Sequence, residues 1–235
     1  MGRPNRIDLG SYVYHVLNRS NGRTPIFLKT GDYEAFLRIA AQALEYVPGM
    51  RLLSYCLMPN HWHLVLWPRA DGELADFMHW LTLTHTQRWH AHYRDVGTGH
   101  LYQGRYKSFP IAEDDHYLTV CRYVERNALR AGLVVRAEEW LWGSLAQRRG
   151  LADGPPLSEG PLALPVQWLR QVNQPQTEAE LASLRRCVQR GQPFGADAWV
   201  RTTCSAMNLE STLVARGRPR VRPESETNEG DNKGS

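Results

Sequence analysis

The fold is decided by residues 58–67, MPNHWHLVLW. This run is apolar and aromatic, which is typical of a strand. Side chains alternate between the two faces of a strand, so His61 and His63 would leave one face while Trp62 and the leucines leave the other. Two imidazoles on one rigid face could bind a divalent metal ion. A half-buried strand with hydrogen-bonded histidines would explain the same residues, so the motif alone leaves both interpretations open.

The flanking sequence alternates between strand-like and helix-like periodicity. Strands are predicted at residues 11–18, 50–57, 61–67 and 105–111, and helices at 32–47, 73–93 and 115–131. The order strand, helix, strand, strand, helix, strand is that of a ferredoxin-like βαββαβ antiparallel sheet with two helices on one face. The sequence therefore predicts an α+β fold.

The chain changes character after residue 149. Residues 150–165 are rich in glycine and proline and are predicted to be a linker. Residues 166–213 show short helical patterns with a break at 190–195, which indicates a small helical C-terminal extension. Residues 214–235 hold an Arg-Gly-Pro segment and an acidic tail that we expect to be disordered. The main domain would then be residues 1–149.

The charge of the chain favours a polyanionic partner. The net charge is +4, but residues 224–235 hold four acids and one lysine. The remaining 223 residues carry 27 basic and 20 acidic side chains, a net of +7. A basic excess with many arginines and aromatics is typical of nucleic-acid-binding proteins, although charge that only aids solubility would give the same count.

The four cysteines carry no functional signal. Cys56, Cys121, Cys187 and Cys204 lie far apart and form no CxxC pair, so free buried thiols are expected rather than disulfides or a zinc cluster.

The first eight residues lack the apolar stretch of a signal peptide, and no apolar run approaches the length of a membrane span. We therefore expect a cytoplasmic protein.

The predicted helix at 115–131 carries the second candidate feature. At about 100° per residue, Tyr123 and Asn127 lie one turn apart on the shoulder of an apolar stripe, beside Arg130. The stripe consists of Tyr117, Val120, Cys121, Val124, Ala128 and Ala131. A helix packed on the sheet by this stripe would present Tyr123 and Asn127 to the sheet edge that holds the histidines.

Together these side chains have a clear chemical use. Asn127 can offer a neutral oxygen as a third ligand beside His61 and His63, which suits an Mg²⁺ or Mn²⁺ ion that keeps water ligands. Such an ion polarises a phosphodiester, and the oxygen of Tyr123 can then attack phosphorus and hold the cleaved strand covalently. A Tyr–Asn pair that only forms a hydrogen bond on a helix surface is the alternative for these two residues.

Three segments together resemble the REP-associated tyrosine transposases. They are the histidine strand, residues 99–107 (GHLYQGRYK) and residues 122–132 (RYVERNALRAG). These proteins are HUH single-strand endonucleases with one catalytic tyrosine, and the resemblance runs from about residue 12 to residue 147. Residues 185–220 resemble the C-terminal extension of the same family. Ala128 departs from the family pattern, which usually has proline after the asparagine.

The resemblance implies a function and a set of site residues. His61, His63 and Asn127 would bind Mg²⁺ or Mn²⁺, and Tyr123 would become linked to a DNA 5′ phosphate and leave a free 3′ hydroxyl. The substrates would be palindromic extragenic repeats folded into single-stranded hairpins, which places the protein at the nucleoid. Residues 1–149 would be the catalytic domain. The basic residues expected to contact DNA are Arg19, Arg105, Lys107, Arg130, Arg216, Arg218 and Arg220.

Other functions remain open on sequence grounds. A DNA-binding regulator that kept the fold but lost catalysis would show the same basic surface. A hydrolase acting on a small substrate through the two histidines would lack the carboxylate base expected beside the metal. Residues 216–222, RGRPRVR, could lie in a DNA minor groove or form a flexible basic tail. The active unit could be a monomer or a dimer that exchanges its tyrosine helix.

Overall fold

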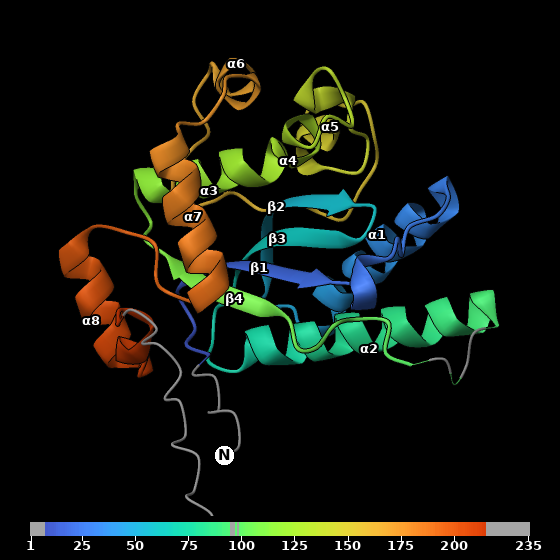
Figure 1. The fold of residues 1–235 in the computed structure, drawn as a ribbon, viewed down its shortest axis with the longest axis horizontal. Coiled ribbons are helices and arrows are strands. Elements are labelled where there is room, and N and C mark those ends of the chain that lie inside the picture. The colour runs from blue at the N-terminus through green and yellow to red at the C-terminus, as the bar shows by residue number, and fades with distance from the viewer. Residues whose placement is uncertain (1–7, 95–96, 98, 215–235) are drawn as a thin grey trace, which may run out of the picture.

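The computed structural model describes residues 8–94, 97 and 99–214. Its centre is a four-stranded antiparallel sheet with strand order β2-β3-β1-β4 (Figure 1). The elements of this central unit are β1 (Val13–Arg19), α1 (Thr30–Tyr46), β2 (Arg51–Met58), β3 (His61–Trp67), α2 (Glu73–Tyr93) and β4 (Lys107–Ile111). This order and topology confirm the predicted ferredoxin-like α+β fold.

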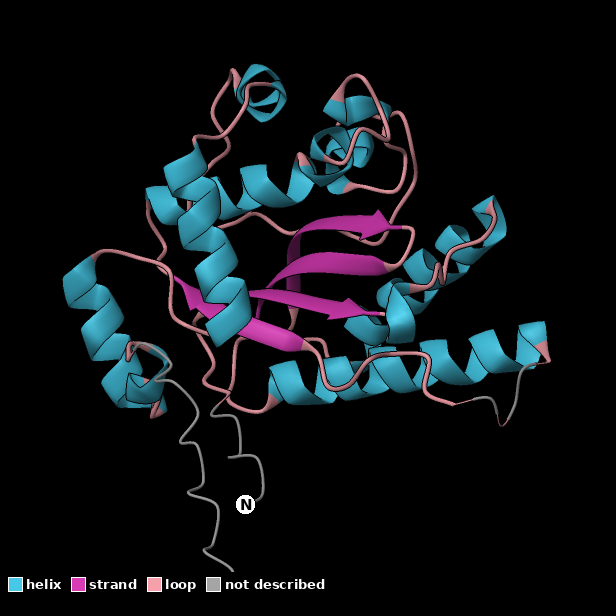
Figure 2. Cartoon of the chain, viewed as in Figure 1, coloured by secondary structure: helices cyan, strands magenta, loops and turns pink. Residues whose placement is uncertain are grey.

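Helices α1 and α2 cover one face of the sheet (Figure 2). Trp62, Leu64 and Leu66 of β3 are buried in the core that these helices form with the sheet, together with Phe36 of α1 and Phe77 of α2. The alternation predicted for β3 is therefore confirmed. The two histidines of this strand leave the opposite face.

Capping shifts the start of α1 by two residues from the predicted position. The carboxylate of Asp32 accepts hydrogen bonds from the backbone N–H groups of Leu28 and Lys29, at 2.7 and 3.1 Å. These bonds bend the chain back onto the first turn, so the helix begins at Thr30. It ends at Tyr46, just before the Pro48–Gly49 pair.

The opposite face of the sheet is covered by α3 (Asp115–Glu125) and the short helix α4 (Asn127–Arg130). Tyr117, Val120 and Val124 of α3 share a core with Val65 of β3 and Ile111 of β4. The apolar stripe predicted for residues 115–131 is thus used as expected over most of its length. It places the tyrosine-bearing helix against the histidine side of the sheet.

The predicted helix at 115–131 is wrong at its end. Gly132 has a φ of +70°, its N–H bonds to the carbonyl of Leu129, and the N–H of Leu133 bonds to the carbonyl of Ala128. This pair of bonds is a Schellman motif, which ends a helix at a left-handed glycine. Ala131 is therefore the exposed C-cap rather than part of the buried stripe.

The second half of the chain adds four helices. Within the described residues they are α5 (Ser144–Arg148), α6 (Trp168–Asn173), α7 (Glu178–Arg190) and α8 (Asp197–Met207), with 3₁₀ turns at Ala137–Glu139 and Glu210–Thr212. A further 3₁₀ turn, Asn21–Arg23, follows β1. Gly191, with a φ of +73°, caps α7 and gives the break predicted at 190–195. The predicted helical extension is confirmed, and Figure 1 shows α7 lying near β4 and α3.

Both edges of the sheet are covered by segments from this second half. The N–H of Ser158 donates to the carbonyl of Leu52 on β2, and Phe194 exchanges hydrogen bonds with Pro110 and Ala112 beside β4. Edge strands with free backbone groups invite pairing with other chains, and these contacts remove part of that edge. Residues 150–165 form no helix or strand, as expected of a linker, yet they pack along the sheet.

Several sequence predictions can be placed beside these observations. All four cysteines are buried and free, as expected. None of the helices in the described part of the chain is long and apolar enough to cross a membrane. Arg216, Arg218 and Arg220 lie outside the described residues. The division into domains at residues 149, 165 and 213 stays a prediction.

Candidate active site

The strand register determines which side chains share the face of the two histidines. His61 of β3 is paired with Arg19 of β1, and His63 is paired with Leu17. Residues directly opposite one another in an antiparallel pair point to the same face. Arg19, which the sequence assigned to DNA contact, therefore lies beside His61.

The ring of His61 is fixed with one nitrogen free for a ligand. Its Nδ1 lies 2.6 Å from Oδ1 of Asn60, an oxygen that only accepts, so Nδ1 carries the proton. Burial, and after it the charges of Arg19 and Arg130, lower the pKa of His61 to about 4. The imidazole is neutral near pH 7, with the lone pair on Nε2.

His63 is held by a third histidine that sequence analysis did not identify. Nε2 of His15 lies 2.8 Å from Nδ1 of His63, and both rings are buried. Burial lowers the pKa of His15 to about 3. Burial and the neighbouring histidines and arginines hold the pKa of His63 well below its usual range. Because both rings are neutral, one nitrogen donates and the other accepts. When Nδ1 of His63 donates, its Nε2 keeps a lone pair.

Helix α3 brings Tyr123 to the same face. Its ring makes an edge contact with the ring of His63, with the centroids 5.8 Å apart. The guanidinium of Arg130 lies over the Tyr123 ring, 4.1 Å from its centroid. The Tyr123 side chain is nearly buried, but its hydroxyl has no hydrogen-bond partner among the described residues. The ring is held on both sides while its oxygen stays free.

Asn127 and Arg130 form a pair one turn beyond Tyr123. Nη2 of Arg130 donates to Oδ1 of Asn127 at 2.6 Å. Three buried nitrogens here lack a partner within the part of the chain that the structure describes: Nδ2 of Asn127, Nη1 of Arg130 and Nε of Arg19. Buried polar atoms are nearly always paired. Unpaired N–H donors beside two neutral imidazoles therefore indicate a place where a ligand binds.

The residues of this face fit a metal ion with a mixed ligand set. Within residues 8–94, 97 and 99–214, no three His, Cys, Asp or Glu side chains are placed to hold one ion. An ion at His61 and His63 would need further oxygen ligands, which water and the amide predicted for this role, Asn127, would have to supply. Metal-bound imidazoles usually have a hydrogen bond at the other ring nitrogen. Asn60 and His15 supply that bond here.

Two of the predicted DNA contacts lie on different sides of the sheet. Lys107 opens β4 and is paired with Leu17, the neighbour of His63, so it lies on the histidine face. Arg105 precedes the strand and lines a groove along α2 with Thr82. The strand predicted at 105–111 begins only at Lys107, so Arg105 is not part of it.

Glu125 is a second buried group that sequence analysis missed. Its Oε1 accepts from the hydroxyl of Ser144 at 2.7 Å and from Nε of Arg148 at 3.3 Å. Its Oε2 accepts from the indole N–H of Trp168 at 2.7 Å. These bonds tie the end of α3 to α5 and α6. They fix the helix turn that carries Tyr123.

The site thus joins two neutral histidines on a central strand with a tyrosine on α3 and an amide at the start of α4. Residues 9–127, half of the chain, match the model of the family described as IS200-like transposase. The chain belongs to this transposase family. The family expected from the sequence resemblance is thereby confirmed.

Two solved structures are similar at low identity. One is a REP-associated tyrosine transposase bound to a REP hairpin; it is 15% identical, has a TM-score of 0.49, and the match covers 68% of this chain and 93% of that one. The other, from Deinococcus radiodurans R1, is described as a transposase; it is 19% identical, has a TM-score of 0.38, and the match covers 53% and 95%. No curated protein matches the chain.

Proposed function

We propose that this transposase is a metal-dependent endonuclease and strand-transferase that acts on single-stranded DNA hairpins. The position of Tyr123 is the observation that supports this most. Its ring lies against His63 and under Arg130, while its hydroxyl has no partner among the described residues. A buried tyrosine that serves only packing usually finds a partner for its hydroxyl. A free phenol beside neutral imidazoles suits a nucleophile.

In the proposed step, the oxygen of Tyr123 attacks the phosphorus of a phosphodiester. A bond forms between that oxygen and phosphorus, and the bond from phosphorus to the 3′ oxygen of the preceding nucleotide breaks. The phenol gives up its proton and the 3′ oxygen gains one. The products are a 5′ phosphotyrosine and a free 3′ hydroxyl. Attack by the 3′ hydroxyl of another strand reverses these bonds and completes strand transfer.

Arg19 and Arg130 would hold the phosphate that is attacked. Each has a buried N–H without a partner in the described chain, and both lie close enough to His61 to lower its pKa. Guanidinium groups bind phosphate oxygens strongly and stabilise the charge that develops during the reaction. Lys107 would contact DNA further along the same face. Arg105 would contact only DNA that passes beside α2.

His61, His63 and Asn127 would hold a Mg²⁺ or Mn²⁺ ion. When bound, such an ion neutralises charge on the phosphate oxygens and makes phosphorus easier to attack. Transposases of this family are generally metal-dependent. Asn127 Oδ1 already accepts from Arg130, and a carbonyl oxygen has a second lone pair for another partner. His15 would accept the Nδ1 proton of His63 and so keep its Nε2 available.

The proposed substrates are hairpins formed by palindromic extragenic repeats. The support is the resemblance of residues 99–107 and 122–132 to the REP-associated members of the family. Such repeats are chromosomal, so the protein would act in the cytoplasm at the nucleoid. Arg216, Arg218 and Arg220 are proposed as further DNA contacts from their sequence alone.

The proposal is tested by looking for a covalent complex between the protein and DNA. The full-length protein is incubated with 3′-labelled hairpin DNA that carries single-stranded flanks, with Mn²⁺ or with excess chelator. We expect a detergent-stable protein–DNA band that requires Mn²⁺ and is absent for Tyr123→Phe. Tight hairpin binding without any adduct would instead identify a DNA-binding regulator. An adduct that survives in Tyr123→Phe would show that another residue is the nucleophile.

A further inference from the structure

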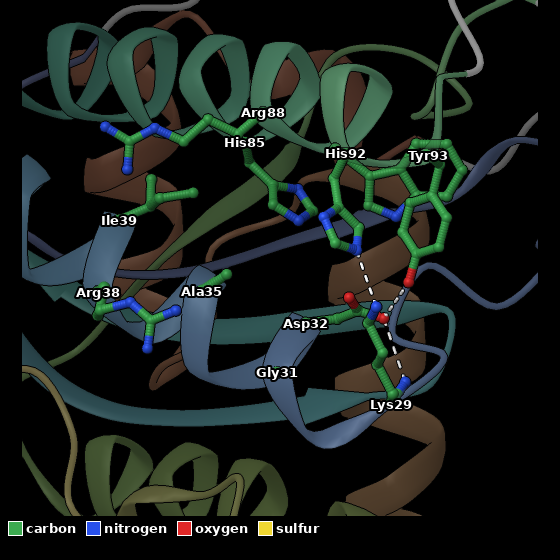
Figure 3. Close-up of a pocket in the computed structure, with 11 residues that line it drawn as sticks. Lys29, Gly31, Asp32, Ala35, Arg38, Ile39, His85, Arg88, His92 and Tyr93 are labelled. Atoms are coloured by element: carbon green, nitrogen blue, oxygen red, sulfur yellow. Dashed lines mark hydrogen bonds between the residues drawn. The ribbon is translucent and has the colours of Figure 1, made fainter.

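A pocket between α1 and α2 has no part in the proposed reaction. It lies on the side of the sheet away from Tyr123 and has a volume of about 290 Å³ (Figure 3). Its middle is apolar, with Ala35 and Ile39 on one wall and the ring of His85 pointing in from α2. Small-molecule sites begin at roughly 300 Å³, so the pocket has room for a single small group.

The two ends of this pocket are cationic. Lys29 and His92 lie at one end, with Nζ of Lys29 2.8 Å from Nε2 of His92. Arg38 and Arg88 lie at the other end, and both are exposed (Figure 3). Asp32 forms part of the floor, but its Oδ2 already accepts three hydrogen bonds from the protein. The lining therefore carries three formal positive charges against one carboxylate that is engaged within the protein, although Arg38 also forms an exposed ion pair with Glu34 at 3.8 Å.

A chain of hydrogen bonds sets the proton position on His85. The indole N–H of Trp62 can only donate, and it lies 3.0 Å from the hydroxyl oxygen of Tyr102. The Tyr102 hydroxyl lies 2.6 Å from Nδ1 of His85. Burial lowers the pKa of His85 to about 3, so its ring is neutral, and burial raises the pKa of Tyr102, so the phenol keeps its proton. Tyr102 thus donates to Nδ1, and the proton of His85 is on Nε2.

The N–H at Nε2 of His85 has no hydrogen-bond acceptor in the described chain. His85 is 3% exposed, and Nε2 has no hydrogen-bond partner among the described residues. Because the ring lines the pocket, this N–H is available to donate to a ligand that brings an acceptor atom. The aromatic rings of Trp89 and Tyr93 line the same pocket and add surface that suits a planar group.

We propose that this pocket binds one nucleotide of a single DNA strand, with the base in the apolar middle and its flanking phosphates at the two cationic ends. His85 donates to an acceptor on the edge of the base. Lys29 contacts one phosphate, and Arg38 and Arg88 contact the other. The inference rests on the proposed function, because it takes the DNA strand as the partner.

This nucleotide is distinct from the one that reacts. The hydrogen-bond chain from His85 ends at Trp62, which lies between His61 and His63 but leaves the opposite face of β3. The pocket and Tyr123 are therefore on the two sides of one strand. A DNA strand that occupies the pocket must pass around the sheet, so the pocket adds affinity for substrates with long single-stranded flanks.

The experiment uses the full-length Tyr123→Phe protein, so that binding is measured without cleavage. The probes are a ten-residue oligothymidylate, dTMP and inorganic phosphate. Histidine labelled with ¹⁵N reports the tautomer of His85 and any shift of Nε2, and titration at several salt concentrations gives the affinity and its salt dependence.

Three variants separate charge from the base contact. Lys29→Gln with Arg88→Gln should lower the slope of log affinity against log salt by about 1.4, or 0.7 for each lost phosphate contact of a single strand. His85→Asn keeps an acceptor for Tyr102, and because its side chain is shorter it places no donor at the position of Nε2, so it should weaken binding with the slope unchanged. Arg186→Gln removes one positive charge at an exposed position of α7 and is the control for a general effect of charge, so it should leave both values unchanged.

These measurements test the nucleotide pocket independently of the proposed cleavage by Tyr123. A shift of the His85 Nε2 signal on adding oligothymidylate, with the expected pattern of variants, supports it. An unmoved signal at saturation, or an equal loss in Arg186→Gln, overturns it. Binding of dTMP as tight as that of the oligonucleotide overturns the assignment to a DNA strand in favour of a free nucleotide. Adduct formation by the unmodified protein is measured separately and does not depend on these results.

Discussion

Two buried polar clusters lie on the same side of the sheet and differ in how their hydrogen bonds are filled. Both carboxylate oxygens of Glu125 accept hydrogen bonds from side chains. Around His63, by contrast, four buried nitrogens lack partners within the described residues: Nδ1 of His15, Nδ2 of Asn127, Nη1 of Arg130 and Nε of Arg19. Each such group costs about 1–3 kcal/mol, so a chain rarely leaves four together.

The difference separates a cluster that stabilises the fold from one that is built for a ligand. The Glu125 cluster connects α3 to α5 and α6 and needs nothing from outside the chain. In the proposed reaction, a bound phosphate would supply acceptors for the unpaired N–H groups of the cluster around His63. The two clusters meet on α3, where Glu125 follows Tyr123 by two residues. The satisfied cluster holds the helix on which the unsatisfied one depends.

The strongest test of the unsatisfied cluster is Tyr123→Phe. We expect cleavage and adduct formation to fall by at least about 10³-fold, because the nucleophilic oxygen is lost. Hairpin affinity should change little, and so should the unfolding free energy, because the hydroxyl has no partner among the described residues. Gel assays of cleavage and urea unfolding measure the two effects. A large loss of stability would show that the hydroxyl serves packing instead.

His61→Ala tests the metal at the same cluster. Binding of Mn²⁺ and Mn²⁺-dependent cleavage should both be lost, because one of two imidazole ligands is removed. The unfolding free energy should change by about 1 kcal/mol or less, since His61 is only partly buried. Mn²⁺ binding is followed by electron paramagnetic resonance. Undiminished cleavage in excess chelator would contradict the metal site.

Glu125→Ala should give the opposite result. Removing the carboxylate leaves the partly buried Arg148 and the N–H of Trp168 without their acceptor, so the protein should lose about 3–5 kcal/mol of stability. Any molecules that remain folded should keep their Mn²⁺ affinity. Glu45→Ala, at an exposed position on α1, is the matched control. If Glu125→Ala instead lost Mn²⁺ binding and kept its full stability, Glu125 would serve the ligand site rather than the fold.

Sequence patterns predicted the parts of this molecule that repeat along the chain. The bounds of α2 and β3 agree with the prediction at both ends. The face shared by His61 and His63 followed from the strand period alone. Bounds set by local capping, such as Asp32 at α1 and Gly132 after α4, were missed by one or two residues.

Contacts between distant segments could not be predicted in this way. His15 reaches His63 only through the β1–β3 register, and the sequence does not give strand register. Glu125 meets Trp168 across 43 positions of the chain. His85 is buried on α2, where Tyr102, from a loop, packs against it. Buried polar partners of this kind are visible only in the fold.

His15 therefore offers a sharper test of the unsatisfied cluster than the proposed metal ligands, His61 and His63, do. His15→Leu should weaken Mn²⁺ binding by about 10- to 100-fold, because His63 loses the acceptor that orients its ring. In His15→Gln an amide oxygen can take the place of Nε2 and restore most of the affinity. Calorimetric Mn²⁺ titration measures both variants. If the His15→Leu and His15→Gln variants bound Mn²⁺ with equal affinity, His15 would only fill space and would not orient the ring of His63.

The last test uses pH, and it extends the comparison to the other face of the sheet. Burial lowers the pKa of His85 from 6.5 to about 3, so between these values the unfolded chain binds a proton that the folded protein does not. Stability must therefore fall as the pH drops below 6.5, with a slope that approaches about 1.4 kcal/mol per pH unit for this histidine, until the pH reaches about 3. His85→Asn cannot take up that proton and keeps an acceptor for Tyr102. We expect the unfolding free energy of this variant, measured by urea, to fall less steeply between pH 6.5 and 4.5 than that of the unmodified protein. The difference in slope should approach about 1.4 kcal/mol per pH unit. Parallel curves would mean that His85 is protonated in the folded state and that its Nδ1 is a donor rather than an acceptor.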